Sequence, residues 1–95
     1  MVEIRIRESR ITARGHATGS VEACAGASAL LCALGGYLEG LGEAVEVRLD
    51  SGEAVVSLSD RAGEKAVGAF EMACEGLRRL GDRYGEFVQV IDDKR

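Results

Sequence analysis

Apolar and polar residues alternate at the start of the chain, where Val2, Ile4 and Ile6 are separated by Glu3 and Arg5. An alternation with a period of two predicts a β-strand that buries one of its faces. Segments of similar character predict four further strands, at residues 11–15, 45–49, 54–58 and 86–91. The sequence Asp50-Ser51-Gly52-Glu53 predicts a tight hairpin turn between the third and the fourth of these strands.

A helical segment follows the second predicted strand. Every side chain from Ala23 to Leu34 is small or apolar, which predicts a helix that begins after an N-cap at Ser20 and ends near Leu41, with Gly42 as its stop. Because a helix that is apolar all round is normally buried, we expect this helix to be covered on most sides. Its glycines each lower the helix propensity by roughly 0.5–1 kcal/mol, so close packing against another backbone must stabilise it.

A second helix is predicted after the fourth strand. Ser59 or Asp60 is its expected N-cap, and the helix is expected to run to about Leu80 and to end at Gly81. Five residues at helical spacing define its buried face: Ala66, Phe70, Ala73, Cys74 and Leu77.

The predicted order of elements is therefore ββαββαβ. Antiparallel hairpins whose helices gather on one face form a two-layer sandwich. We expect an α+β fold of this kind, with a mainly antiparallel sheet and two helices. A chain of 95 residues has room for one core, so we expect a single domain over residues 1–95.

The net charge of −4 argues against a nucleic-acid partner and against an anionic membrane surface. The early arginines stand among glutamates and are expected to form a solvated sheet face: Arg5, Arg7, Arg10 and Arg14. We expect no apolar stretch of transmembrane length, and the chain starts with a strand pattern rather than a signal peptide, which favours the cytoplasm.

The chain holds three cysteines without paired spacing. An odd number of cysteines fits free thiols in a reducing compartment better than a disulfide framework. No CxxC motif or cluster of cysteine and histidine suggests zinc, and the glycines form no phosphate-binding fingerprint. We therefore expect neither a metal nor a cofactor.

The candidate chemistry lies in Gly15-His16-Ala17 and in Cys24, eight residues after the chain's single histidine. The seven residues between the two could span about 25 Å when extended, so the chain can fold back and bring His16 to Cys24. An imidazole could then take the thiol proton, and free N–H groups of the first helical turn could stabilise the anion or a developing oxyanion. Such a pair is the minimum of a cysteine hydrolase.

A plainer interpretation stands beside this one. A cysteine in an alanine-rich helix is often a small buried hydrophobic residue, and a histidine after a glycine is often a turn residue. We expect Cys32 and Cys74, in apolar surroundings in the middle of their helices, to be core residues.

Gly15-His16-Ala17, a short loop and then Cys-Ala-Gly-Ala-Ser-Ala-Leu at residues 24–30 resemble the Prp family, the ribosomal-processing cysteine proteases of bacteria. The strands, the Asp-Ser-Gly-Glu hairpin and the long second helix are similar as well, so the resemblance spans essentially the whole chain. It implies a small cytoplasmic homodimer that removes a short N-terminal extension from a large-subunit ribosomal protein. It also implies that Cys24 is the nucleophile and His16 the general base.

The chain departs from the Prp pattern at two points. The loop of residues 17–23 is several residues shorter than is usual in that family, where a mobile loop is expected to admit substrate. Val21 stands three residues before the cysteine, where the family commonly has an acidic residue, and Glu22 follows one step later. A non-catalytic Prp-like protein-interaction module is therefore the alternative to a cysteine endopeptidase.

Overall fold

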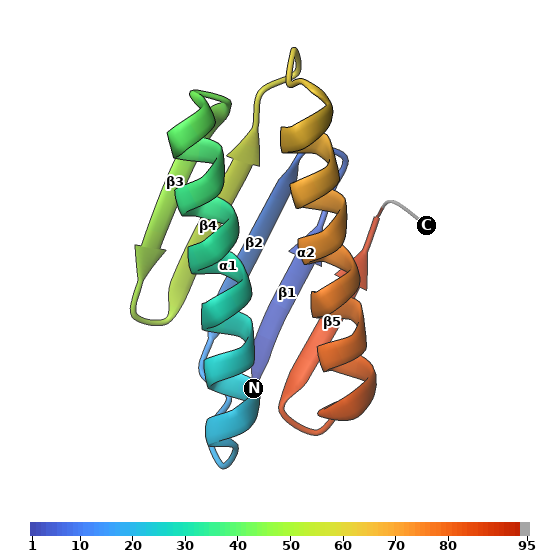
Figure 1. Cartoon of the computed structure of the whole chain (residues 1–95). Coiled ribbons are helices and arrows are strands. Elements are labelled where there is room, and N and C mark those ends of the chain that lie inside the picture. Colours follow the sequence, from blue (N-terminus) through green and yellow to red (C-terminus); the bar gives the residue numbers. More distant parts are fainter. Residues whose placement is uncertain (94–95) are drawn as a thin grey trace.

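The computed structural model describes residues 1–93. Its elements follow the predicted order ββαββαβ (Figure 1). They are β1 (Val2–Ile6), β2 (Arg10–Gly15), α1 (Val21–Leu41), β3 (Ala44–Asp50), β4 (Glu53–Leu58), α2 (Glu64–Arg83) and β5 (Val88–Asp92).

The five strands form one sheet in the order β3-β4-β2-β1-β5. β1 pairs with β2, β2 with β4 and β3 with β4 in antiparallel fashion, whereas β5 returns after α2 and pairs in parallel with β1. The sheet is thus mixed, with one parallel pair at an edge. The expected α+β sandwich with a mainly antiparallel sheet is confirmed.

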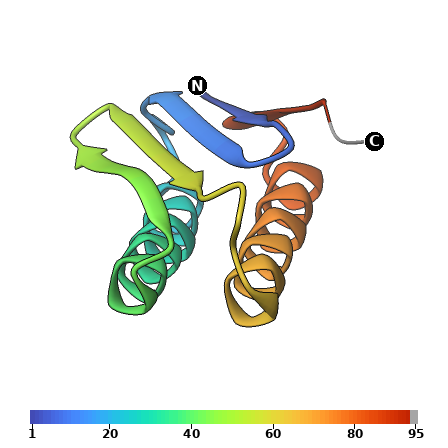
Figure 2. The ribbon, with the colours of Figure 1, turned by 90° about the horizontal axis from the view of Figure 1, so that it is seen from above.

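Both helices cover the same face of the sheet and leave the other face open (Figure 2). The alternation in β1 is observed as predicted, because Val2, Ile4 and Ile6 are buried beneath the helices. The core also holds the predicted face of α2, in which Phe70 and Leu77 are fully buried. The strand pattern therefore determines which side of the sheet the helices cover.

Both predicted caps of α1 are confirmed, whereas both predicted ends of α2 are wrong. The Ser20 side chain accepts a hydrogen bond from the N–H of Ala23, and Gly42 ends α1 in the left-handed conformation with φ of 72°. The second helix, however, begins at Glu64 after Gly63, not after Ser59 or Asp60. The Ser59 hydroxyl instead accepts a hydrogen bond from the N–H of Arg61 in the preceding turn. Helix α2 also continues past Gly81 to Arg83, because a glycine within a helix is tolerated.

The expectation that α1 is covered on most sides is wrong. One face is buried, namely Ala23, Ala27, Leu31, Leu34, Gly35 and Leu38. The opposite face is exposed although it is apolar, as Val21 and Tyr37 show at 80% and 46% exposure. The sequence alone could not distinguish a buried helix from one with an uncovered apolar face, because both lack charged residues.

The expectation about transmembrane length is also wrong for α1. Over Val21–Leu41 this helix is long and apolar enough to cross a membrane, with a mean hydropathy of 1.5 in its most apolar window. Length and composition are weak evidence here, since the core helix of a soluble protein meets the same criteria. In this fold one face of α1 packs on the sheet.

Close contacts of α1 with its neighbours are made through glycines. A Cβ at Gly26 would lie 2.9 Å from Leu80 of α2, and one at Gly76 of α2 would lie 2.9 Å from Leu30 of α1. Each helix therefore presents a leucine to a glycine of the other. The close packing expected from the small residues is present, although the partners are side chains rather than backbone.

Candidate active site

His16 directly follows β2, next to the turn that joins β3 to β4. Gly15, at the end of β2, has a φ of 94° and donates its N–H to the carbonyl oxygen of Gly52, 2.9 Å away. A Cβ at Gly15 would overlap the carbonyl oxygen of Met1, so only glycine fits there. This hydrogen bond holds the residue before His16 against the turn and so fixes the position of the His16 backbone.

Cys24 lies one turn into α1 and is exposed. Its N–H bonds to the carbonyl oxygen of Ser20 at 3.2 Å, while the N–H of Ala23 bonds to the Ser20 side chain. The expectation that first-turn N–H groups are free to stabilise an anion is therefore wrong for these two residues. The thiol still lies near the positive end of the helix dipole, which favours negative charge.

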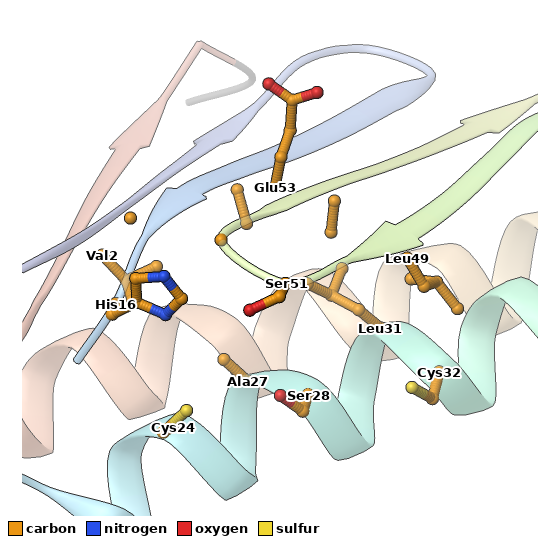
Figure 3. Close-up of a pocket in the computed structure, with 14 residues that line it drawn as sticks. Val2, His16, Cys24, Ala27, Ser28, Leu31, Cys32, Leu49, Ser51 and Glu53 are labelled. Carbon is orange, nitrogen blue, oxygen red and sulfur yellow. The ribbon is translucent and has the colours of Figure 1, made fainter. Parts of the chain in front are cut away.

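His16 and Cys24 line one cavity of about 210 Å³ between α1, the end of β2 and the β3–β4 turn (Figure 3). Most of its surface is apolar. The apolar lining comes from both layers of the fold: Val2, Ala13, Ala27, Leu31, Leu49 and Ala54. Ser28 and Ser51 add hydroxyl groups beside the histidine and the thiol.

The fold brings the two predicted residues to the same cavity, with the imidazole above the helix that carries the thiol (Figure 3). Within residues 1–93 the imidazole has no hydrogen-bond partner, and no hydrogen bond joins it to Cys24. The pair thus shares a pocket without a hydrogen bond between its two members.

Cys24 also lines a second, open hollow. It is lined by Ala17, Gly19, Ser20, Val21, Cys24 and Ala25. The loop before α1 is a tight turn, because Ser20 donates its N–H to the carbonyl oxygen of Ala17. Ala17 itself is buried. Cys24 therefore lines two depressions, one that it shares with His16 and one that it shares with the short loop.

Of the other two cysteines, both predicted to be core residues, only one is buried. Cys74 is buried in the core as expected, but Cys32 is exposed. Cys32 lies eight residues after Cys24 on the same face of α1 and lines the same cavity, with Ser28 between them (Figure 3). Cys24, Ser28 and Cys32 follow one another at intervals of four, and in the sequence this spacing could have indicated that they share a helix face.

The β3–β4 turn is the part of the site that the sequence interpretation missed. Ser51 and Gly52 line the cavity together with His16, although more than 30 residues separate them from it. A Cβ at Gly52 would lie 2.9 Å from Nε2 of His16. No local signal in the sequence places this hairpin beside the histidine, since the contact depends on the pairing of β2 with β4.

The early arginines lie on the open face of the sheet, as expected, and form ion pairs there. Glu46 contacts Arg10 at 3.4 Å and Arg48 at 3.4 Å, and Glu53 contacts Arg14 at 3.6 Å and Arg48 at 3.1 Å. This network neutralises much of the positive charge of the face. Within residues 1–93, no group of three metal-ligating side chains comes together.

No family model matches the sequence, and no curated protein matches it at the sequence level. Solved structures do match. The chain has the fold of the ribosomal processing protease Prp from S. aureus, determined with a covalently linked product peptide. The two superpose with a TM-score of 0.77 at 20% identity over 97% of each chain.

A structure of the same S. aureus protease with a substrate peptide has a TM-score of 0.76 at 20% identity, again over 97% of each chain. The protein SMU.848 from Streptococcus mutans has a TM-score of 0.71 at 25% identity, over 97% of this chain and 93% of its own. The likeness thus covers the whole fold and includes both helices and all five strands.

Proposed function

We propose that the protein is a cysteine endopeptidase in which Cys24 is the nucleophile and His16 the general base. The observation that carries this proposal is that the thiol and the imidazole, from two different elements, line one cavity. The whole-chain likeness to a protease that has been crystallised with substrate and product peptides supports the same conclusion.

The chemistry needs only groups that the chain supplies. His16 takes the proton of the Cys24 thiol, and the thiolate attacks the carbonyl carbon of the scissile peptide bond. The tetrahedral intermediate collapses, the C–N bond breaks, and the leaving amine receives the proton from the imidazolium. Water then hydrolyses the thioester, with His16 as the base that activates it.

The two hollows beside Cys24 suit an extended peptide. Cys24 lines both the apolar cavity that contains His16 and the open hollow beside the loop. A chain that passes over Cys24 could therefore occupy both hollows, one on each side of the bond that is cut. The mainly apolar cavity favours an apolar side chain of the substrate.

We further propose that the substrate is the N-terminal extension of a large-subunit ribosomal protein and that the enzyme acts in the cytoplasm. The name of the S. aureus relative, a ribosomal processing protease, supports the first part. Free cysteines, two of them exposed, fit a reducing compartment and support the second.

A cleavage assay tests the proposal directly. Peptides copied from extended ribosomal-protein N-termini are incubated with the wild type, with Cys24→Ala and with His16→Ala, and the products are identified by mass spectrometry. Both substitutions are expected to abolish cleavage, whereas Cys32→Ala, in the same cavity, should retain it. Cleavage by the Cys24→Ala variant would exclude the mechanism, and a wild type that binds these peptides without cutting them would favour the interaction module.

We also propose that the chain forms a homodimer through the uncovered apolar surface between α1 and α2. Leu30, Ala33, Leu34, Tyr37, Met72 and Ala73 contribute to this surface. Tyr37 and Met72 are 46% and 73% exposed, and Met72 in particular is costly to leave in water. A second copy of the chain would cover these side chains on both partners.

A further inference from the structure

We propose that the β3–β4 turn is the third part of the catalytic machinery and that Ser51 is a positioning residue for His16. This inference rests on the proposed function, because it assigns a role toward the base of that mechanism. A general base in a nucleophile–base pair needs a third group that holds the ring in the productive orientation. Within residues 1–93 no carboxylate or amide hydrogen-bonds to the imidazole, so the turn is the element in a position to do so.

The turn lies close to the ring at Gly52. Nε2 is the ring atom nearest to the place of a Cβ at Gly52, at 2.9 Å, followed by Cε1 at 3.3 Å. The turn itself is held in place, because its Gly52 carbonyl oxygen accepts the N–H of Gly15, the residue before the histidine. The turn is therefore held beside the residue that precedes the histidine.

The position of Gly52 distinguishes the two ring nitrogens. With Nε2 on the side of the turn, Nδ1 is the nitrogen left to receive the thiol proton. In Figure 3 one ring nitrogen points toward the sheet and the other toward α1, which carries Cys24. The productive tautomer thus keeps its proton on Nε2 and presents the Nδ1 lone pair to the thiol.

Ser51 supplies the acceptor that this tautomer needs. Its side chain lines the cavity, and its hydroxyl oxygen points toward the side on which His16 lies (Figure 3). The Ser51 hydroxyl has no hydrogen-bond partner within residues 1–93, so it is available to accept the Nε2 proton in a hydrogen bond. When Nδ1 takes the thiol proton, this bond also stabilises the imidazolium, because a charged donor makes the stronger hydrogen bond.

The test measures the rate of alkylation of Cys24 by iodoacetamide across about pH 5–9, in a Cys32→Ser background so that Cys24 is the exposed thiol. We compare the parent with Ser51→Ala, Ser51→Thr, His16→Ala and the double variant. Ser51→Ala is expected to lower the His16-dependent part of the rate about tenfold near neutral pH, and Ser51→Thr to restore most of it. In the His16→Ala background, Ser51→Ala should have no further effect.

The outcomes separate this inference from the proposed function. If His16→Ala changes the profile but Ser51→Ala does not, the positioning role is wrong and the pair of His16 and Cys24 stands. If Ser51→Ala acts equally with and without His16, its effect is structural and the positioning role is again wrong. If His16→Ala leaves the profile unchanged, both proposals fail. Circular dichroism and thermal unfolding of each variant show that the compared proteins are folded.

Discussion

Gly52 lies so close to His16 that no side chain fits between them: a Cβ on Gly52 would be 2.9 Å from Nε2 of the imidazole. The turn and the histidine are distant in sequence, and the antiparallel pairing of β2 with β4 brings them together. Gly52 also has a φ of 79°, a conformation that residues with a side chain rarely adopt. Glycine at position 52 therefore has two roles: it adopts the left-handed conformation of the hairpin turn, and its lack of a side chain leaves room for the imidazole.

Gly52→Ala is expected to displace the imidazole and to slow the reaction of Cys24 with iodoacetamide to the rate seen in His16→Ala. The variant also suffers backbone strain of about 1 kcal/mol or more, which lowers its stability. Gly42→Ala is the matched control, because Gly42 has a φ of 72° and nothing within 4 Å of its missing Cβ. Alkylation kinetics and urea unfolding are measured for both. A Cys24 that is equally slow in Gly42→Ala would show that strain alone causes the effect.

The three thiols are expected to react at three different rates with iodoacetamide in the native protein. Cys74 is buried and should be protected, and Cys32 should react as an ordinary exposed thiol. Cys24 should react about tenfold faster than Cys32 near neutral pH, because His16 and the helix N-terminus favour its thiolate. Peptide mapping by mass spectrometry after timed labelling gives all three rates in one sample. Equal rates at Cys24 and Cys32 would contradict the proposed pairing with His16.

Most of the elements could be predicted from the sequence because local chemistry determines them. The alternation of Val2, Ile4 and Ile6 is a property of one strand, and the caps at Ser20 and Gly42 depend on a few adjacent residues. The failed prediction for the start of α2 has the same origin. Ser59 has the chemistry of an N-cap, and its hydroxyl does accept a backbone N–H, but within a turn that precedes the helix.

The site could be predicted only in part, because it depends on long-range pairing. His16 and Cys24 could be identified as candidates from their residue types and spacing. Ser51 and Gly52 could not, since their position beside His16 follows from the register of β2 against β4. The exposure of Cys32 was missed for a related reason: an apolar helix face looks the same in sequence whether a neighbour covers it or not.

Two adjacent glycines of α1 should respond to alanine with opposite changes in stability. At Gly36 nothing lies within 4 Å of a new Cβ, so Gly36→Ala should stabilise the protein by about 0.5–1 kcal/mol through helix propensity. At Gly35 the Cβ would lie 2.8 Å from Cγ1 of Val47 in β3. Valine is β-branched and restricted in χ1, so its side chain cannot easily rotate away. Gly35→Ala should destabilise by about 1 kcal/mol after the propensity gain is counted. Denaturant unfolding compares the two, and an equal gain at both positions would mean that α1 does not pack on β3 this closely.

The proposed homodimer should be disrupted by a charge in the groove between α1 and α2. Met72→Glu is expected to convert the protein to a monomer, because the new carboxylate would be buried without a partner. Val45→Glu is the control, since Val45 is similarly exposed, at 71%, but lies on β3 away from the groove. Light scattering coupled to size-exclusion chromatography gives the masses. A monomeric wild type, or a dimer that survives Met72→Glu, would rule out this interface.

An ion pair between Arg78 of α2 and Asp92 of β5 is expected to hold the edge strand in place. The two side chains are only 17% and 12% exposed, and the guanidinium donates directly to the carboxylate. This hydrogen bond is the main cause that raises the pKa of Arg78 above its usual range. Arg78→Met, which keeps the aliphatic length, should cost about 2 kcal/mol because it leaves a partly buried carboxylate without this donor.

Arg79 is the matched control for this prediction. It pairs with Glu75 one turn earlier and is 78% exposed, so Arg79→Met should cost no more than about 0.5 kcal/mol. A raised pKa of a cation contributes stability fully below its unfolded-state value, and that stability is lost only as the pH rises through the folded-state value. The difference between the two variants should therefore be constant between about pH 7 and pH 9. Equal losses of stability in Arg78→Met and Arg79→Met, measured by urea unfolding, would show that the position of β5 does not depend on this ion pair.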